Sequence, residues 1–134
     1  MNINKIIICT LIGFSPLNLM AKDGDPDISE KARMVAASKK LAKKPNQISI
    51  YVKGLVCSSC SIGVKVQLRK LDGVDKSQLE KGVKLDVKTQ LATLALIPGA
   101  KISEAAIKKA IDKAGYEAGG TFRLKGSSVK SIKY

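Results

Sequence analysis

The order in which hydrophobic periodicities follow one another along the chain restricts its fold more than any other feature. Apolar residues alternate over residues 48–52, as in a half-buried strand, and then repeat at helical spacing over residues 60–71. Alternation returns in two runs over residues 83–96, which predicts a hairpin, and a second helical face follows over residues 103–114. A last strand is expected from Tyr116. This order predicts an α+β sandwich, in which two helices cover one face of an antiparallel sheet.

Turn and cap residues mark the same boundaries. Gly73 is expected to end the first helix, and Thr89-Gln90 to form the turn of the hairpin. Ser103 is a predicted N-cap of the second helix, which Gly115 ends. We therefore expect one ferredoxin-like βαββαβ domain over residues 48–124.

The first 21 residues have the pattern of a secretory signal peptide. Lys5 supplies a positive start, residues 6–14 are apolar, and Ala21 offers a cleavage point. Nine apolar residues are too few to cross a bilayer, so we expect cleavage near Ala21 and a periplasmic or secreted protein. Cleavage would remove Cys9 and leave a single pair of cysteines.

Two further segments flank the predicted domain. Residues 22–47 begin acidic and turn-rich and then become basic, which predicts either a basic linker or a marginal helix capped by Asp27 and ended by Pro45. Residues 125–134 are basic and polar, and we expect a flexible tail there. Both segments are expected to lie outside the compact part of the chain.

The composition excludes several classes of function. The chain has no histidine, which removes Ser–His and Cys–His catalytic pairs and every imidazole metal site. Its net charge is 24 − 11 = +13, but the lysines are spread at helix-like spacing and only 4% of the residues are aromatic. This pattern indicates solvated helix faces rather than a stacking platform for nucleic acid. We expect a monomer without a nucleic-acid partner.

The candidate site is the pair Cys57 and Cys60, at C-x-x-C spacing where a helix is predicted to begin. Thiols at this spacing can converge on one point, and the free N–H groups of a helix start favour thiolate. A disulfide between them is possible in an oxidising compartment, but it would close a very short loop and stabilise little. A closed zinc site needs four ligands, which two thiols without histidine cannot supply.

Soft-metal binding and thiol–disulfide exchange are then the two functions left for the pair. Two thiolates without a third strong ligand suit ions that form two near-linear bonds, and Cu(I) and Hg(II) are both such ions. The alternative is a thiol–disulfide oxidoreductase that uses the same cysteines. No Trp precedes the pair, and the strand order fits a thioredoxin-like protein poorly.

The segment from Ile48 to about Gly119 resembles heavy-metal-associated domains, the modules of copper chaperones, metal-transporting ATPases and periplasmic mercury-binding proteins. The run Gly54-Leu55-Val56-Cys57-Ser58-Ser59-Cys60 stands where that family has G-M-x-C-x-x-C. Matching positions follow in both helices and in the third strand: Val64, Leu68, Leu71, Asp72-Gly73-Val74, Ala92-Thr93-Leu94, Ala110-Ile111 and Ala114-Gly115-Tyr116-Glu117. Two departures are the Leu at the usual Met position and a longer stretch at residues 75–82.

Together with the signal-like first 21 residues, this resemblance implies an exported carrier or scavenger of a soft metal ion, not an enzyme, with one Cu(I) or Hg(II) held by the two cysteines. It implies a metal-transporting membrane protein or another thiol-bearing acceptor as partner. It also implies that Tyr116 lies near the site and that Leu55 packs beneath the metal loop as an apolar brace. Ser58 and Ser59 can donate hydrogen bonds that stabilise thiolate charge.

Overall fold

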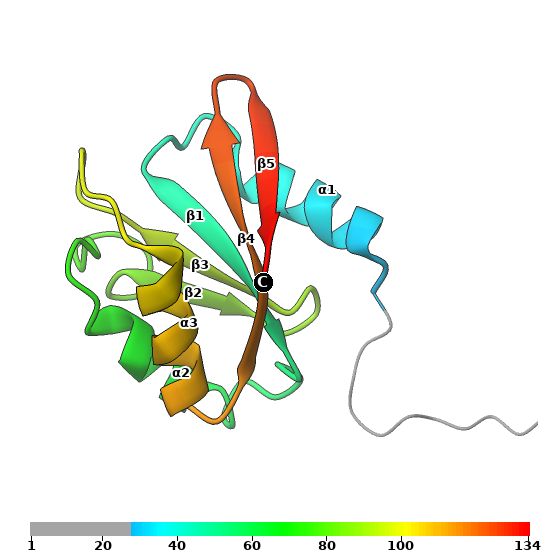
Figure 1. Ribbon diagram of the computed structural model, residues 1–134, viewed down its shortest axis with the longest axis vertical. Helices are drawn as coiled ribbons and strands as arrows, with labels where there is room; N and C mark the ends of the chain where they lie inside the picture. The colour runs from blue at the N-terminus through cyan, green and yellow to red at the C-terminus, as the bar shows by residue number, and fades with distance from the viewer. Residues whose placement is uncertain (1–27) are drawn as a thin grey trace, which may run out of the picture.

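The computed structural model describes residues 28–134, so the predicted signal peptide lies outside the described residues. Eight elements follow one another along this part of the chain (Figure 1): α1 (Glu30–Leu41), β1 (Gln47–Lys53), α2 (Ile62–Arg69), β2 (Val83–Asp86), β3 (Leu91–Ala95), α3 (Glu104–Lys113), β4 (Glu117–Lys125) and β5 (Ser128–Lys133). The strands form one antiparallel sheet in the order β2-β3-β1-β4-β5. Elements β1 to β4 with α2 and α3 have the predicted ferredoxin-like topology.

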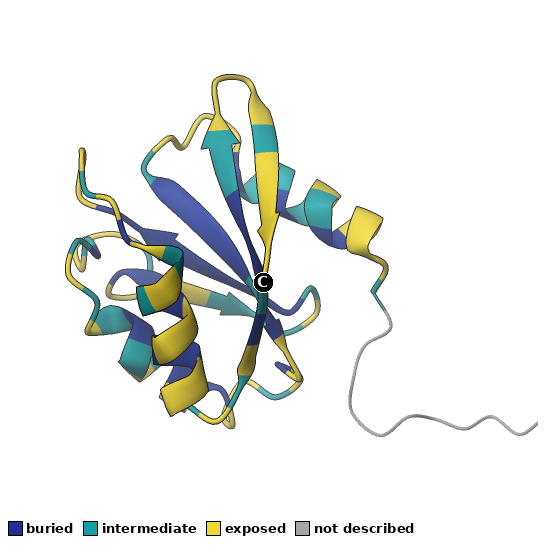
Figure 2. Cartoon of the chain, in the orientation of Figure 1, coloured by how far each residue is buried: buried dark blue, intermediate teal, exposed yellow. Residues whose placement is uncertain are grey.

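Helices α2 and α3 cover one face of the sheet, and the main core lies between them and the strands (Figures 1 and 2). Ile48, Ile50 and Val52 of β1 point into this core, as their alternation predicts, and each is almost wholly buried. The helices add the apolar faces that the sequence predicts, including Val64 of α2 and Ile107 of α3. The burial of these periodic faces is what holds the two layers together.

The predicted turns also form. The Ser103 hydroxyl accepts a hydrogen bond from the Ala106 N–H at 3.2 Å and caps α3, while Gly115 follows that helix with a φ of +81°. Gly73 has a φ of +95° in the turn after α2. Gln90 ends the β2–β3 turn with a φ of +54°, although it is not a glycine.

The segment before the predicted domain is part of the fold. Of the two alternatives for this segment, a linker or a marginal helix, the helix forms: residues 30–41 are α1, which packs on the face of the sheet opposite α2 and α3 (Figure 1). Its side chains Ala37 and Leu41 are fully buried against Leu91 and Phe122 and form a second core. Ser29 caps this helix by accepting a hydrogen bond from Ala32, whereas the predicted cap, Asp27, lies outside the described residues.

The predicted flexible tail is a strand. Residues 128–133 form β5, which pairs with β4 along its whole length after a turn at Gly126, where φ is +65°. Val129 packs against the second core beneath α1. Most side chains of this segment remain exposed, so their burial cannot account for its order. Backbone hydrogen bonds to β4 order it instead. No helix in residues 28–134 is long and apolar enough to span a membrane.

Candidate metal centre

The two cysteines lie in the loop that joins β1 to α2. The chain leaves β1 at Lys53, turns at Gly54 with a φ of +75°, and reaches the helix at Ile62. The β2–β3 turn lies at the same end of the sheet, since the Val52 N–H donates to the Gln90 carbonyl at 3.0 Å. The start of β4 is also there, since Lys53 pairs with Glu117 in the sheet.

One backbone turn brings the cysteines together ahead of α2. The Ser61 N–H donates to the Cys57 carbonyl at 3.1 Å, which closes a turn over residues 57–61. Within it, the Cys60 N–H donates to Cys57 Sγ at 3.4 Å, and Ser59 Oγ lies 3.0 Å from the same sulfur. Cys57 is half-buried and Cys60 is exposed, so an incoming ion or thiol can reach the pair from solvent.

These contacts give the two thiols different acidities. Hydrogen bonds from the Cys60 thiol, the Ser59 hydroxyl and backbone N–H groups lower the pKa of Cys57 to about 6. The same interaction, together with the charge on Cys57, raises the pKa of Cys60. At neutral pH the site therefore holds one thiolate and one thiol, and a soft ion that bound both sulfurs would displace the proton of Cys60.

Tyr116 lies near enough to the pair to respond to its charge. Partial burial, followed by the negative charges of Cys60 and Cys57, raises the pKa of the Tyr116 phenol. The ring packs against the edge of the main core. Tyr116 is thus a neutral group near the thiols at neutral pH.

The other residues predicted around the site have distinct places. Leu55 is fully buried in the main core beneath the loop, which is the position of an apolar brace. Ser59 contacts Cys57, but Ser58 contributes its backbone, because its carbonyl accepts a hydrogen bond from the Ser61 hydroxyl at 2.9 Å. Ser61 is fully buried and helps to close the turn. The sequence does not single out Ser61, since nothing in the spacing of three serines shows which one faces inward.

The described residues supply no third strong ligand. No group of three or more His, Cys, Asp or Glu side chains in residues 28–134 could hold a metal ion. The carboxylate of Glu117, at the same end of the sheet, is engaged in an ion pair with Lys53. The pair itself offers two sulfurs, which suit a soft ion with a low coordination number.

Part of the chain is similar to solved structures of copper domains. A copper-binding domain from HMA7, a P-type ATPase, is 29% identical over 54% of this chain and 88% of that domain, with a TM-score of 0.43. The CopZ metallochaperone is 22% identical over 54% of this chain and 97% of its own, also with a TM-score of 0.43. The yeast copper transporter domain Ccc2a is 22% identical over 55% of this chain and 90% of that domain, with the same TM-score.

These similarities extend over about half of the chain. The chain matches no model of a known protein family, and a comparison with curated proteins finds no match.

Proposed function

We propose that the protein binds one Cu(I) ion between Cys57 and Cys60 and passes it to a thiol-bearing acceptor. The observation that carries this proposal is the open pair of sulfurs, one of them a thiolate at neutral pH, without a third ligand among the described residues. Thiolate ligands select soft ions over Zn(II), which would need two further ligands. Hg(II) meets the same description, and the resemblance to copper chaperones favours Cu(I) as the usual cargo.

Transfer would proceed by ligand exchange. A thiolate of the acceptor adds to the bound ion, a three-coordinate intermediate forms, and one of the original sulfurs leaves. Cys60 is the sulfur suited to leave first, because it is the more exposed and holds its proton more tightly than Cys57. The protein acts here as a carrier, and the reaction needs no catalytic residue.

The setting that we propose for this carrier is outside the cytoplasm. The signal-like segment of residues 1–21 supports export, and a metal-transporting membrane protein is the expected acceptor. Cleavage at Ala21 would remove Lys5, and the remaining net charge of 23 − 11 = +12 would favour an encounter with an acidic surface on that acceptor. N-terminal sequencing of the protein recovered from cells tests the export proposal: an intact Met1 on cytoplasmic protein would contradict it.

A competition titration tests the cargo. The reduced protein is titrated with Cu(I), Hg(II) and Zn(II) against chelators of known affinity under anaerobic conditions. We expect one Cu(I) or Hg(II) per chain with an affinity far above that for Zn(II). Tight Zn(II) binding with no preference for the soft ions would contradict the proposal.

A second function is supported by the acidity of Cys57. A thiol with a pKa of about 6 is largely ionised at neutral pH, and an ionised thiol can also attack a disulfide. A thiol–disulfide oxidoreductase would reduce insulin with a turnover that depends on both cysteines. Insulin reduction together with no measurable affinity for Cu(I) would favour this second function over metal transfer.

A further inference from the structure

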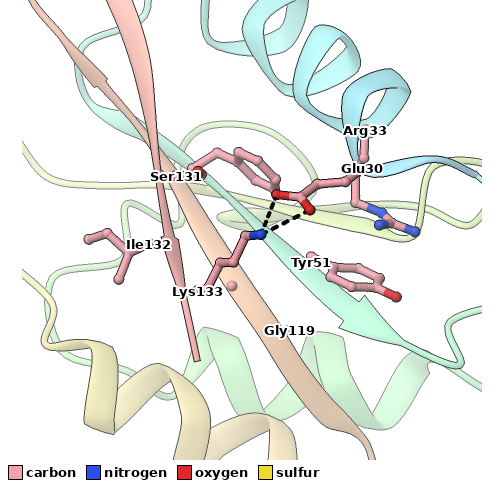
Figure 3. A pocket seen from close by; sticks show the side chains of 9 residues that line it. Glu30, Arg33, Tyr51, Gly119, Ser131, Ile132 and Lys133 are labelled. Carbon is pink, nitrogen blue, oxygen red and sulfur yellow. Dashed lines mark hydrogen bonds and ion pairs between the residues drawn. The ribbon is translucent and has the colours of Figure 1, made fainter.

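A buried arginine of α1 lies on the face of the sheet opposite the main core. Arg33 is only 6% exposed, and its guanidinium stacks on the ring of Tyr51, with Cζ 3.5 Å from the ring centroid (Figure 3). Any side chain at Gly119 would collide with this ring, because a Cβ there would lie 2.3 Å from Tyr51 Cδ1. The ring is therefore held between the guanidinium and the β4 backbone.

The same guanidinium also holds the β2–β3 turn. Arg33 Nε donates to the Thr89 carbonyl at 3.2 Å, and Arg33 Nη2 donates to Gln90 Oε1 at 2.7 Å. Gln90 is 1% exposed and has a φ of +54°, a conformation that is uncommon for a non-glycine residue. The fork of donors on Arg33 stabilises this buried turn through both contacts.

From this turn, backbone hydrogen bonds lead to the thiol loop. The Gln90 carbonyl accepts from the Val52 N–H at 3.0 Å, where β1 runs into the loop. The Val52 carbonyl in turn accepts from the Leu55 N–H at 3.4 Å. Leu55 is the fully buried residue two positions before Cys57. Arg33 thus contacts both elements, β1 and the β2–β3 turn, that determine how the loop leaves the sheet.

We propose that Arg33 is a positioning residue for the Cys57–Cys60 loop, which it orients through Tyr51, Thr89 and Gln90 from the opposite face of the sheet. The inference rests on the proposed metal function of the pair. It gives α1 a role in the site although the helix does not touch the cysteines. Lys40 of α1 also holds the β2–β3 turn, since its Nζ donates to Asp86 Oδ2 at 2.6 Å where the turn begins.

The test compares Arg33→Ala and Arg33→Lys with the wild-type protein and with Phe122→Leu. Phe122 belongs to the same second core but does not bond to the turn, so its substitution controls for lost packing. Two quantities are measured at a temperature where all the variants are folded. They are the Cu(I) affinity, by chelator competition, and the rate of hydrogen exchange at the Val52 and Leu55 amides.

We expect both Arg33 variants to bind Cu(I) about tenfold more weakly, the lower end of the loss seen when groups that orient metal ligands are removed. The lysine variant keeps the charge but lacks the planar fork, in which separate nitrogens reach the Thr89 carbonyl and Gln90 Oε1. Exchange at Val52 and Leu55 should accelerate in both, whereas Phe122→Leu should keep wild-type affinity and wild-type exchange at these two amides.

The inference is overturned if Arg33→Ala binds Cu(I) as tightly as the wild type, or if Arg33→Lys restores full affinity, since the charge alone would then suffice. If Arg33→Ala does not fold, Arg33→Lys decides the question. A wild-type protein that binds no Cu(I) would instead refute the proposed function. The exchange measurement would still decide whether Arg33 orders the loop, and unchanged exchange in the Arg33 variants would refute that role.

Discussion

The backbone N–H of Cys60 donates to Cys57 Sγ over 3.4 Å, so the second cysteine of the pair stabilises the charge of the first. Ser59 Oγ, at 3.0 Å from the same sulfur, adds to this stabilisation. The two thiols therefore differ in acidity. Cys57 is the more acidic and is ionised for binding a soft ion, whereas Cys60 is the less acidic and is suited to leave the ion during exchange. The predictions below follow from this difference and from the elements that hold the loop.

The two thiols should titrate separately. Cys57 should be alkylated by iodoacetamide with a midpoint near its pKa of about 6, and Cys60 with a midpoint above that of an ordinary thiol. Peptide mass spectrometry of partly alkylated protein over a pH series measures both midpoints. A common midpoint for the two cysteines near pH ~8.5, the ordinary value for a thiol, would contradict the assigned contacts.

Cu(I) binding should release protons in a pH-dependent way. Between the pKa of Cys57, about 6, and the raised pKa of Cys60, only Cys60 is protonated in the free protein. Loading the site in this range should therefore release about one proton per ion, and the affinity should rise with pH. Below the pKa of Cys57 the number should increase towards about two. Calorimetry in buffers of different ionisation enthalpy measures this number.

Ser59→Ala should raise the pKa of Cys57, because it removes the hydroxyl that contacts Cys57 Sγ. Ser58→Ala is the matched control, since Ser58 takes part in the turn through its carbonyl. The alkylation midpoint of Cys57 should move to higher pH in the first variant and stay unchanged in the second. Equal shifts of the midpoint in both variants would contradict the assignment of Ser59, rather than Ser58, as the serine whose hydroxyl contacts Cys57 Sγ.

Leu55→Ala should destabilise the protein by about 2–5 kcal/mol, because it leaves a cavity beneath the thiol loop where a fully buried side chain stood. Leu55→Met keeps nearly the same volume and should cost less than about 1.5 kcal/mol. Chemical denaturation of both variants measures these differences. A cost for the alanine variant as small as that for the methionine variant would show that Leu55 does not brace the loop.

The contact between Lys40 and Asp86 should weaken in acid. Burial opposes the charge of Asp86, but hydrogen bonding and attraction to Lys40 lower its pKa overall. A carboxyl with a lowered pKa in the folded state contributes stability above its unfolded pKa, and this contribution is lost as the pH falls through the folded value. Asp86→Asn should therefore cost up to about 1 kcal/mol at neutral pH and nothing in strong acid. Denaturation curves at the two pH values test this, and an equal cost at both would contradict it.

The elements from β1 to β4 could be predicted because each carries its own periodicity. A helix was one of the two alternatives for the α1 segment, but its packing on the sheet could not be predicted, since one of its three buried positions is Arg33, which no hydrophobic pattern counts as core. That arginine is buried because Tyr51 and Gln90, both distant in sequence, supply a ring and an acceptor. Strand β5 was also wrongly expected to be flexible, since its order comes from pairing with β4 rather than from its own side chains.

The candidate site was partly predictable for a similar reason. The spacing of Cys57 and Cys60 is local information, and their place ahead of a helix follows from the pattern around them. Which serine contacts the sulfur depends on the path of the loop, so Ser58 and Ser59 could not be told apart from the sequence. The link from α1 to the loop could not be predicted at all, because it depends on contacts of Arg33 with residues that are distant in the sequence.

The most direct test of the central claim is the Cu(I) affinity of Cys57→Ser/Cys60→Ser, measured beside the wild type by the same chelator competition under reducing conditions. The wild type should bind one Cu(I) per chain, and the double variant, which should keep the fold because both positions lie in a loop outside the core, should bind none at the concentrations used. A double variant that retains wild-type affinity would show that the two sulfurs are not the metal site.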